Sequence, residues 1–150
     1  MLSKFGYYHG AAIIRLLEDE RCRSVRRQEY GYVVNEKAFV FFKYKTKTRS
    51  PWGFNFDQED IDYCLKMGAE YECFALGLIC GGDGVCALDW EEAKTLLGGK
   101  SGSITADRKH RHQYSVWGSA EELKNKISVN RWPNLLFEQK QEKGNNVSEL

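Results

Sequence analysis

The sequence predicts one α+β domain, a central mixed β-sheet flanked by about four helices. Patterns with helical and strand periods follow one another as helix, two or three strands, helix, two strands, helix, two strands and helix. Residues 73–80 are apolar at every position, which indicates a central strand covered on both sides. A chain of 150 residues with 42% hydrophobic side chains can bury its own core.

The first half of the domain begins with a helix. Residues 8–20 carry apolar side chains at helical spacing. Residues 25–34 and 38–46 alternate as strands do, and residues 35–37 read as the turn that joins them in a hairpin. Residues 53–56 are a candidate for a short third strand beside them.

A second helix and a second hairpin are expected next. Asp57 is a plausible N-cap for a helix that ends at Gly68. Carboxylates crowd its first turn, where they suit the helix dipole; they are Asp57, Glu59, Asp60 and Asp62. The apolar run 73–80 then turns through residues 81–84 into another strand, residues 85–88.

Two capping boxes mark the helices of the last third. Asp89 with Glu92 opens a helix that ends at Gly98, and Ser119 with Glu122 predicts a last helix carrying Leu123 and Ile127. Strands are expected near residues 104 and 114–117. We expect the domain to cover residues 1–137, closed by the segment 131–133, and residues 138–150 to form a flexible polar tail.

The predicted core follows from these periodicities. It comprises Ile13, Leu16, Leu17, Val40, Phe42, Phe54, Ile61, Leu65, Phe74, Leu76, Leu78, Val85, Leu88, Trp90, Leu97, Val116 and Leu123.

Charge and cysteine content narrow the class of protein. The net charge of +1 gives no global attraction to nucleic acid, so any electrostatic partner must be recognised by a local patch. The five cysteines lack a two-residue spacing, and four lie in apolar patterns, which favours buried free thiols. The first residues show no apolar leader, so we expect a soluble cytoplasmic protein without a membrane contact.

The candidate binding site is a series of cations that continues one strand. If the strand extends, Lys43, Lys45, Lys47 and Arg49 share one face, beyond the apolar Phe39 and Phe41. Four cations on one face bind phosphates or carboxylates. The alternative is that these lysines only protect an exposed sheet edge. Trp52 follows in an aromatic segment, where it is either a stacking surface for bases or a buried part of the core.

Three further groups are candidates. The basic run 108–112 is either a nucleic-acid contact through Arg108, Lys109 and Arg111 or a solvated hairpin tip. His9 lies beside Gly10, where it either reaches a ligand or forms part of the core edge. The sequence predicts no metal site from the histidines of the basic run.

Several motifs together resemble a family of uncharacterised bacterial proteins, over residues 8–133. They are His9-Gly10-Ala11-Ala12, Lys43-Tyr44 with Thr46-Lys47, Ser50-Pro51-Trp52 with Phe54 and Phe56, and Ile79-Cys80-Gly81 with Asp83-Gly84. That family has no established activity, so the resemblance implies kinship alone.

A looser analogy is to the restriction-endonuclease-like fold, whose core runs helix, three strands, helix, strand. Enzymes of that fold bind Mg²⁺ through carboxylates beside a lysine. By this analogy Lys43 takes the place of the lysine, and Glu36 and Glu20 are candidates for the carboxylates. The position two residues before Lys43 is Phe41 where such enzymes have an acid, so the analogy favours a scaffold that binds over one that cuts.

Three functional hypotheses follow. The first is a non-catalytic binding module, without a cofactor, for nucleic acid or an acidic protein surface. The second is a Mg²⁺-dependent nuclease with a displaced acid. The third is a small counter-defence or regulatory protein that acts by docking to another protein.

Overall fold

The computed structural model describes residues 3–137, which form a single α+β domain. Its elements are α1 (Lys4–Leu17), β1 (Val25–Gln28), β2 (Gly31–Val34), β3 (Ala38–Lys45), β4 (Trp52–Phe56), α2 (Gln58–Glu70), β5 (Cys73–Cys80), β6 (Gly84–Leu88), α3 (Trp90–Leu97), β7 (Gly102–Asp107) and β8 (Ser115–Gly118). Residues 131–137 form a further helix. No helix in the described part of the chain has the length and apolar character needed to cross a membrane.

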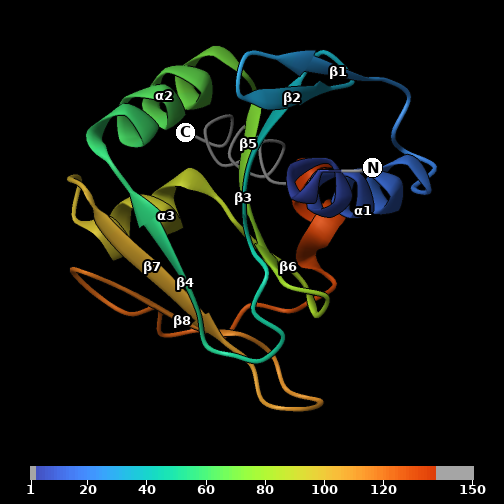
Figure 1. Cartoon of the computed structure of the whole chain (residues 1–150). Coiled ribbons are helices and arrows are strands. Elements are labelled where there is room, and N and C mark those ends of the chain that lie inside the picture. Colours follow the sequence, from blue (N-terminus) through green and yellow to red (C-terminus); the bar gives the residue numbers. More distant parts are fainter. Residues whose placement is uncertain (1–2, 138–150) are drawn as a thin grey trace, which may run out of the picture.

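The larger sheet is mixed and has the order β1-β2-β3-β5-β6. Its one parallel pair joins β3 to β5, and the connection between them runs through β4 and α2. In Figure 1, α1 covers one face of this sheet, and α2 and α3 lie on the other side. Every residue of β5 is buried, which confirms the prediction of a central strand covered on both faces.

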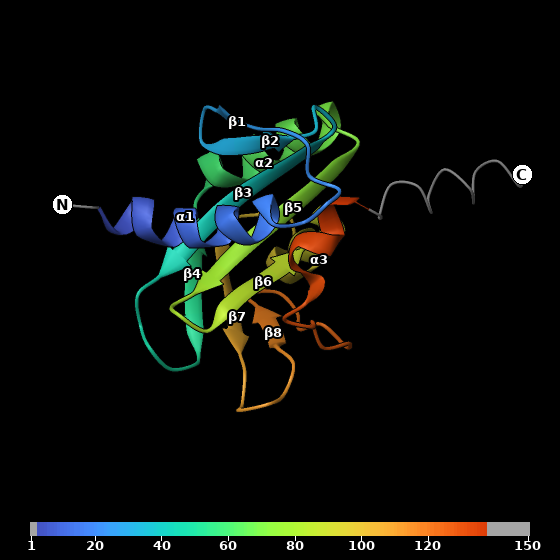
Figure 2. The ribbon, with the colours of Figure 1, turned by 90° about the vertical axis from the view of Figure 1, so that its right-hand side faces the viewer.

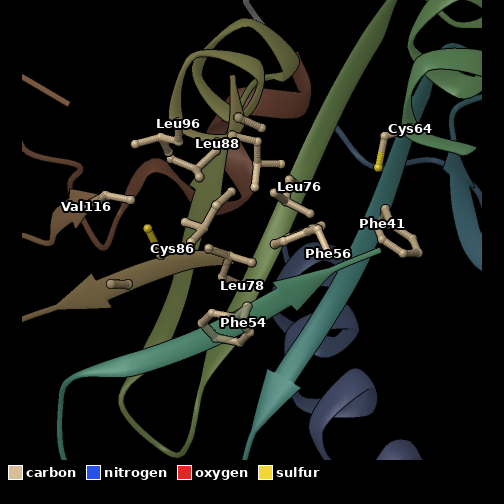
Figure 3. Close-up of a cluster of buried hydrophobic side chains, with 14 of the residues drawn as sticks. Phe41, Phe54, Phe56, Cys64, Leu76, Leu78, Cys86, Leu88, Leu96 and Val116 are labelled. Atoms are coloured by element: carbon tan, nitrogen blue, oxygen red, sulfur yellow. The ribbon is translucent and has the colours of Figure 1, made fainter. Parts of the chain in front are cut away.

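A second sheet, β4-β7-β8, was not predicted. The candidate third strand at residues 53–56 exists, but as β4 it pairs with β7 and leaves the first sheet. Trp52, Phe54 and Phe56 are buried and the residues between them are exposed, so β4 turns one face inward. Figure 3 shows Phe54 and Phe56 pointing toward Leu76 and Leu78 of β5, where the two sheets share a core.

The prediction of one strand over residues 25–34 is wrong. The segment forms β1 and β2, which pair with each other across a tight turn at Glu29 and Tyr30. Glu29 adopts a positive φ of 53°, the geometry of a turn. The predicted hairpin around residues 35–37 is confirmed, because Val34 pairs with Ala38.

The prediction of a helix opened by Ser119 and Glu122 is also wrong. The Ser119 hydroxyl accepts a hydrogen bond from the Ser103 amide at 2.7 Å, so it is not available as a cap. Gly118 packs so closely on α3 that an added Cβ would collide with the Leu96 carbonyl oxygen. The chain therefore returns along β8 as an extended segment, with isolated bridges from Trp117 to Glu122 and from Tyr114 to Ile127.

The fourth helix lies later in the chain than expected. Residues 131–137 are helical where the sequence predicted only the close of the ordered part. The buried Trp132 anchors them against α1 by donating a hydrogen bond from Nε1 to the Ala12 carbonyl at 3.2 Å. The polar tail predicted for residues 138–150 lies outside the described residues.

Most of the predicted core is buried, on both faces of the larger sheet. The prediction that Leu17 and Leu65 are buried is wrong, because each is exposed on the outer side of its helix. Ile13, Trp90 and Leu123 are only partly buried.

The prediction of free thiols is confirmed. All five cysteines are free, and four of them are buried. Burial raises the pKa of Cys64 and of Cys80 to about 12, so both stay protonated near neutral pH.

Candidate functional site

The predicted row of four cations is broken after its second member. The register pairs Lys45 of β3 with Cys80, the last residue of β5, so no partner strand continues beyond it. The Gly81 amide donates to the Lys45 carbonyl at 2.9 Å, and the chain then bends through residues 46–51. Lys47 turns back to donate from Nζ to the Pro51 carbonyl at 3.1 Å. Lys47 and Arg49 therefore do not extend the face of Lys43 and Lys45.

Trp52 is part of the core. It is 2% exposed, and its Nε1 donates to the Lys47 carbonyl at 2.8 Å. A base has no access to this ring, so the interpretation of Trp52 as a stacking surface is wrong.

Lys43 has an acidic partner that the sequence analysis assigned only to the helix dipole. Its Nζ lies 3.0 Å from Asp60 Oδ2 in the first turn of α2, and both side chains are about one quarter exposed. The same carboxylate accepts a hydrogen bond from the Asp57 amide and completes a capping box. Lys43 also lies 4.9 Å from the centre of the Phe56 ring. Asp60 thus holds the lysine against α2 and compensates its charge, so Lys43 is less available to bind an anion.

A cleft opens beside this ion pair, over the free edge of β3. Strand β2 pairs only as far along β3 as Val40, so the edge of β3 beyond Val40 has no strand partner among residues 3–137. Two adjoining cavities, each of about 340 Å³, follow this edge and share Phe5, His9 and Phe42 in their walls. The remaining walls come from β1, the β1–β2 turn, β3, β4 and α2; their residues are Arg27, Tyr30, Phe41, Lys43, Tyr44, Lys45, Phe54, Asn55, Glu59, Asp60 and Tyr63.

His9 forms part of the wall between the two cavities. It is 4% exposed, its ring stacks on Phe5 at 3.9 Å between centres, and its Nδ1 lies 3.1 Å from the Tyr32 hydroxyl. Burial, with the positive charge of Arg27 nearby, lowers the pKa of His9 from 6.5 to about 4. The imidazole is therefore neutral at physiological pH and can exchange a hydrogen bond with a ligand without bringing a charge.

Tyr30 presents the most open aromatic ring of the cleft. It is 68% exposed at the tip of the β1–β2 turn, with its ring in edge contact with Tyr63 at 5.3 Å. The Tyr63 hydroxyl donates to the Gln28 carbonyl at 2.9 Å and accepts from the Tyr30 amide at 3.3 Å. These bonds involve the backbone of the turn, so α2 positions Tyr30 while leaving its ring free.

Arg27 and Lys45 are the cations of the cleft that have no acidic partner among residues 3–137. The guanidinium of Arg27 lies 5.5 Å from the centre of the Phe5 ring, and its Nε donates to the Glu29 carbonyl. Lys45 is exposed at the end of β3. An open cleft with planar rings and free cations can hold a ligand that combines rings with negative charge.

A second cationic region adjoins the end of β3, and we call it the basic end. It consists of the exposed Lys47, Arg49, Lys109 and Arg111, from two loops that meet where the Ser50 hydroxyl donates to the Arg108 carbonyl at 3.2 Å. Figure 2 shows both loops at the lower end of the molecule. Arg108 itself is not available, because its Nη1 lies 2.9 Å from Asp83 Oδ1 and the Tyr114 hydroxyl donates to the same carboxylate. The structure thus joins two basic segments that the sequence analysis had treated separately.

The candidate catalytic residues do not come together. Glu36 lies in the turn before β3, at the opposite end of that strand from Lys43, and pairs with Arg26 at 2.8 Å. Glu20 lies in the turn after α1, exposed to solvent. Residues 3–137 contain no group of three or more metal-ligating side chains. The surroundings of Lys43 therefore do not fit a Mg²⁺ ion, since Asp60 supplies one carboxylate that is already paired.

Comparison with known proteins adds no relative. No family model, curated protein or solved structure matches this chain. The resemblance to an uncharacterised bacterial family and the analogy to restriction endonucleases therefore remain predictions.

Sequence reasoning identified His9, Lys43 and Lys45 but missed the other residues that shape the cleft. Phe5, Arg27 and Tyr30 come from three separate elements and carry no motif. One signal was available: a strand of eight residues, β3, is paired on one side by a strand of only four. That difference in length leaves part of an edge open.

Proposed function

We propose that this chain is a non-catalytic module that binds single-stranded nucleic acid, with a base in the cleft and phosphates at the basic end. The observation that carries the proposal is the open ring of Tyr30 in a cleft lined by aromatic side chains, together with Arg27, which has no acidic partner in the described part of the chain. Binders of single strands combine rings, on which bases stack, with a cationic path for the backbone.

The cleft suits an unpaired base for two reasons. Tyr30 and the Arg27 guanidinium both offer planar surfaces, and planar groups of these kinds stack on bases. The neutral His9 supplies a hydrogen-bonding group at the inner wall, and Asn55 supplies an amide near the end occupied by Lys45. A duplex would keep its bases stacked inside, so the cleft favours single strands.

The phosphates of the same strand would follow Lys45 toward Lys47 and Arg49. None of these three cations has an acidic partner among the described residues. A Lys43 held by Asp60 contributes little, because its charge is already compensated. Three to four phosphate contacts give a salt slope of roughly −2 to −3 in a plot of log K against log salt concentration.

A salt titration tests the proposal. Fluorescence anisotropy with a labelled oligothymidine, repeated with the same sequence as a duplex, measures the affinity and its salt dependence. We expect binding of the single strand that weakens with salt, and weaker binding of the duplex. An absence of binding to DNA and RNA single strands at low ionic strength contradicts the proposal, and binding of an acidic peptide instead would support the protein-partner hypothesis.

The nuclease hypothesis has one supporting observation, the carboxylate of Asp60 beside Lys43. Residues 3–137 hold no group of three or more side chains that could bind a metal ion, so we derive no reaction step from it. Incubation with single-stranded DNA and Mg²⁺ or Mn²⁺ decides the matter. Cleavage that disappears in a Lys43→Ala variant would replace the binding proposal with the nuclease.

A further inference from the structure

The outer face of α1 carries an apolar stripe that no described residue covers. Tyr7, Ile14 and Leu17 are 62%, 57% and 57% exposed, and they follow one another at helical spacing on one side of the helix. Gly10 and Ala11 lie in the middle of the stripe. A Cβ added at Gly10 would meet no atom within 4 Å, so the centre of the stripe is open. In Figure 2, α1 runs along the outside of the larger sheet.

The stripes of two copies of α1 are complementary when the two helices run antiparallel. A two-fold axis between Gly10 and Ala11 brings Tyr7 of one copy to the level of Ile14 of the other, because their numbers lie symmetrically about that axis. The small residues at the crossing allow the two helices to approach closely. The same operation brings Gly10 of one copy to the level of Ala11 of the other.

The charges at the ends of the stripe agree with this arrangement. Lys4 begins α1 and Glu18 caps its end, and both are exposed on the side of the stripe. The same two-fold axis places Lys4 of one copy next to Leu17 and Glu18 of the other, twice per pair. The opposed directions also bring the positive end of each helix dipole to the negative end of its neighbour. Neither Lys4 nor Glu18 has an ion pair within residues 3–137.

We propose that the chain forms a symmetric dimer through the outer face of α1, with a second copy of α1 packed antiparallel across Gly10 and Ala11. This inference does not rest on the proposed nucleic-acid binding, because Phe5 and His9 lie on the opposite, inner side of the helix. A helix of 14 residues is roughly 21 Å long. The contact is therefore smaller than a standard interface, and we expect a dissociation constant on the order of 100 µM.

Charge reversal tests the proposed geometry in the full chain. Sedimentation velocity from about 10 µM to about 1 mM should show a monomer that shifts toward a dimer across that range. Lys4→Glu alone and Glu18→Lys alone should each weaken the dimer at least threefold, because each places two like charges together. The combined variant Lys4→Glu/Glu18→Lys should restore the dimer, because the pairs are then exchanged.

The design separates association from folding. Glutamate near the first turn of a helix and lysine near the last are both favourable to the helix dipole, so neither substitution should unfold the monomer. Ile14→Glu should abolish the dimer, whereas Leu65→Glu, at a leucine 48% exposed on α2, should leave it unchanged. A monomer throughout the concentration range, a combined variant that stays monomeric, or equal effects of Ile14→Glu and Leu65→Glu would each overturn the proposal.

Discussion

The cleft and the basic end differ in how their residues are brought together. The cleft collects side chains from α1, β1, the β1–β2 turn, β3, β4 and α2, and packing holds several of them on two or more sides. The basic end collects cations from two loops that are joined by one hydrogen bond, and its residues are exposed to solvent. We infer that the cleft provides a shaped site and that the basic end provides charge with little shape.

This difference shows why a row of cations in a sequence is a weak guide to a site. Lys43, Lys45, Lys47 and Arg49 alternate along the chain, but the strand that would align them ends with its partner β5. The residues that shape the cleft have no such regularity. A site of this kind depends on where strands of unequal length leave an edge open.

The largest expected effect concerns a core residue that holds the loop of the basic end. Trp52 fills the core, and its Nε1 holds the loop of the basic end at the Lys47 carbonyl. We expect Trp52→Ala to reduce the free energy of unfolding by about 3–5 kcal/mol, measured by urea denaturation. Trp52→Phe, which loses the hydrogen bond but keeps much of the volume, should cost about 1–2 kcal/mol. Equal stability of Trp52→Ala and the wild type would contradict the buried position.

The second prediction concerns His9, at the inner wall of the cleft. Because the pKa of His9 is about 4 when folded and 6.5 when unfolded, the unfolded chain binds more protons between these values. The contribution of His9 to stability is therefore greatest above pH 6.5 and is lost as the pH drops toward 4. We expect the free energy of unfolding of the wild type to fall by on the order of 2–3 kcal/mol over this window, relative to that of His9→Gln. Urea denaturation of both proteins at a series of pH values measures the difference. Parallel curves for the two proteins would show that His9 is not buried in its neutral form.

A smaller effect concerns the ion pair beside the cleft. Lys43→Met leaves the Asp60 carboxylate partly buried without its cation, and it should cost about 1–2 kcal/mol in the free energy of unfolding. Lys45→Met is the matched control, because Lys45 is exposed and has no ion pair within residues 3–137; its effect should stay within about 0.5 kcal/mol. If the two variants are equally stable, Asp60 does not hold Lys43.

The sequence predicted the structure correctly where the residues of one segment alone determine its secondary structure. The apolar run 73–80 predicted a central strand, and Asp57 and Asp89 predicted the starts of α2 and α3. The failures occurred where distant contacts decided the outcome. Ser119 has the capping-box pattern, but its hydroxyl is taken by Ser103, sixteen residues away, and Gly118 is pressed against α3. The cleft also depends on contacts between distant segments, because Asp60 reaches Lys43 only when α2 packs beside β3.

The salt dependence of oligothymidine binding tests the central claim, that the cleft stacks a base and the basic end holds phosphates. Tyr30→Ala should weaken binding about tenfold at every salt concentration and leave the slope of log K against log salt unchanged, because stacking releases no counterions. Arg49→Ala should reduce that slope by about 0.7, and Tyr7→Ala, at a tyrosine of similar exposure on the outer face of α1, should change neither quantity. A Tyr30→Ala variant that binds like the wild type, while Tyr7→Ala or Arg49→Ala lowers the affinity, would contradict a base in the cleft.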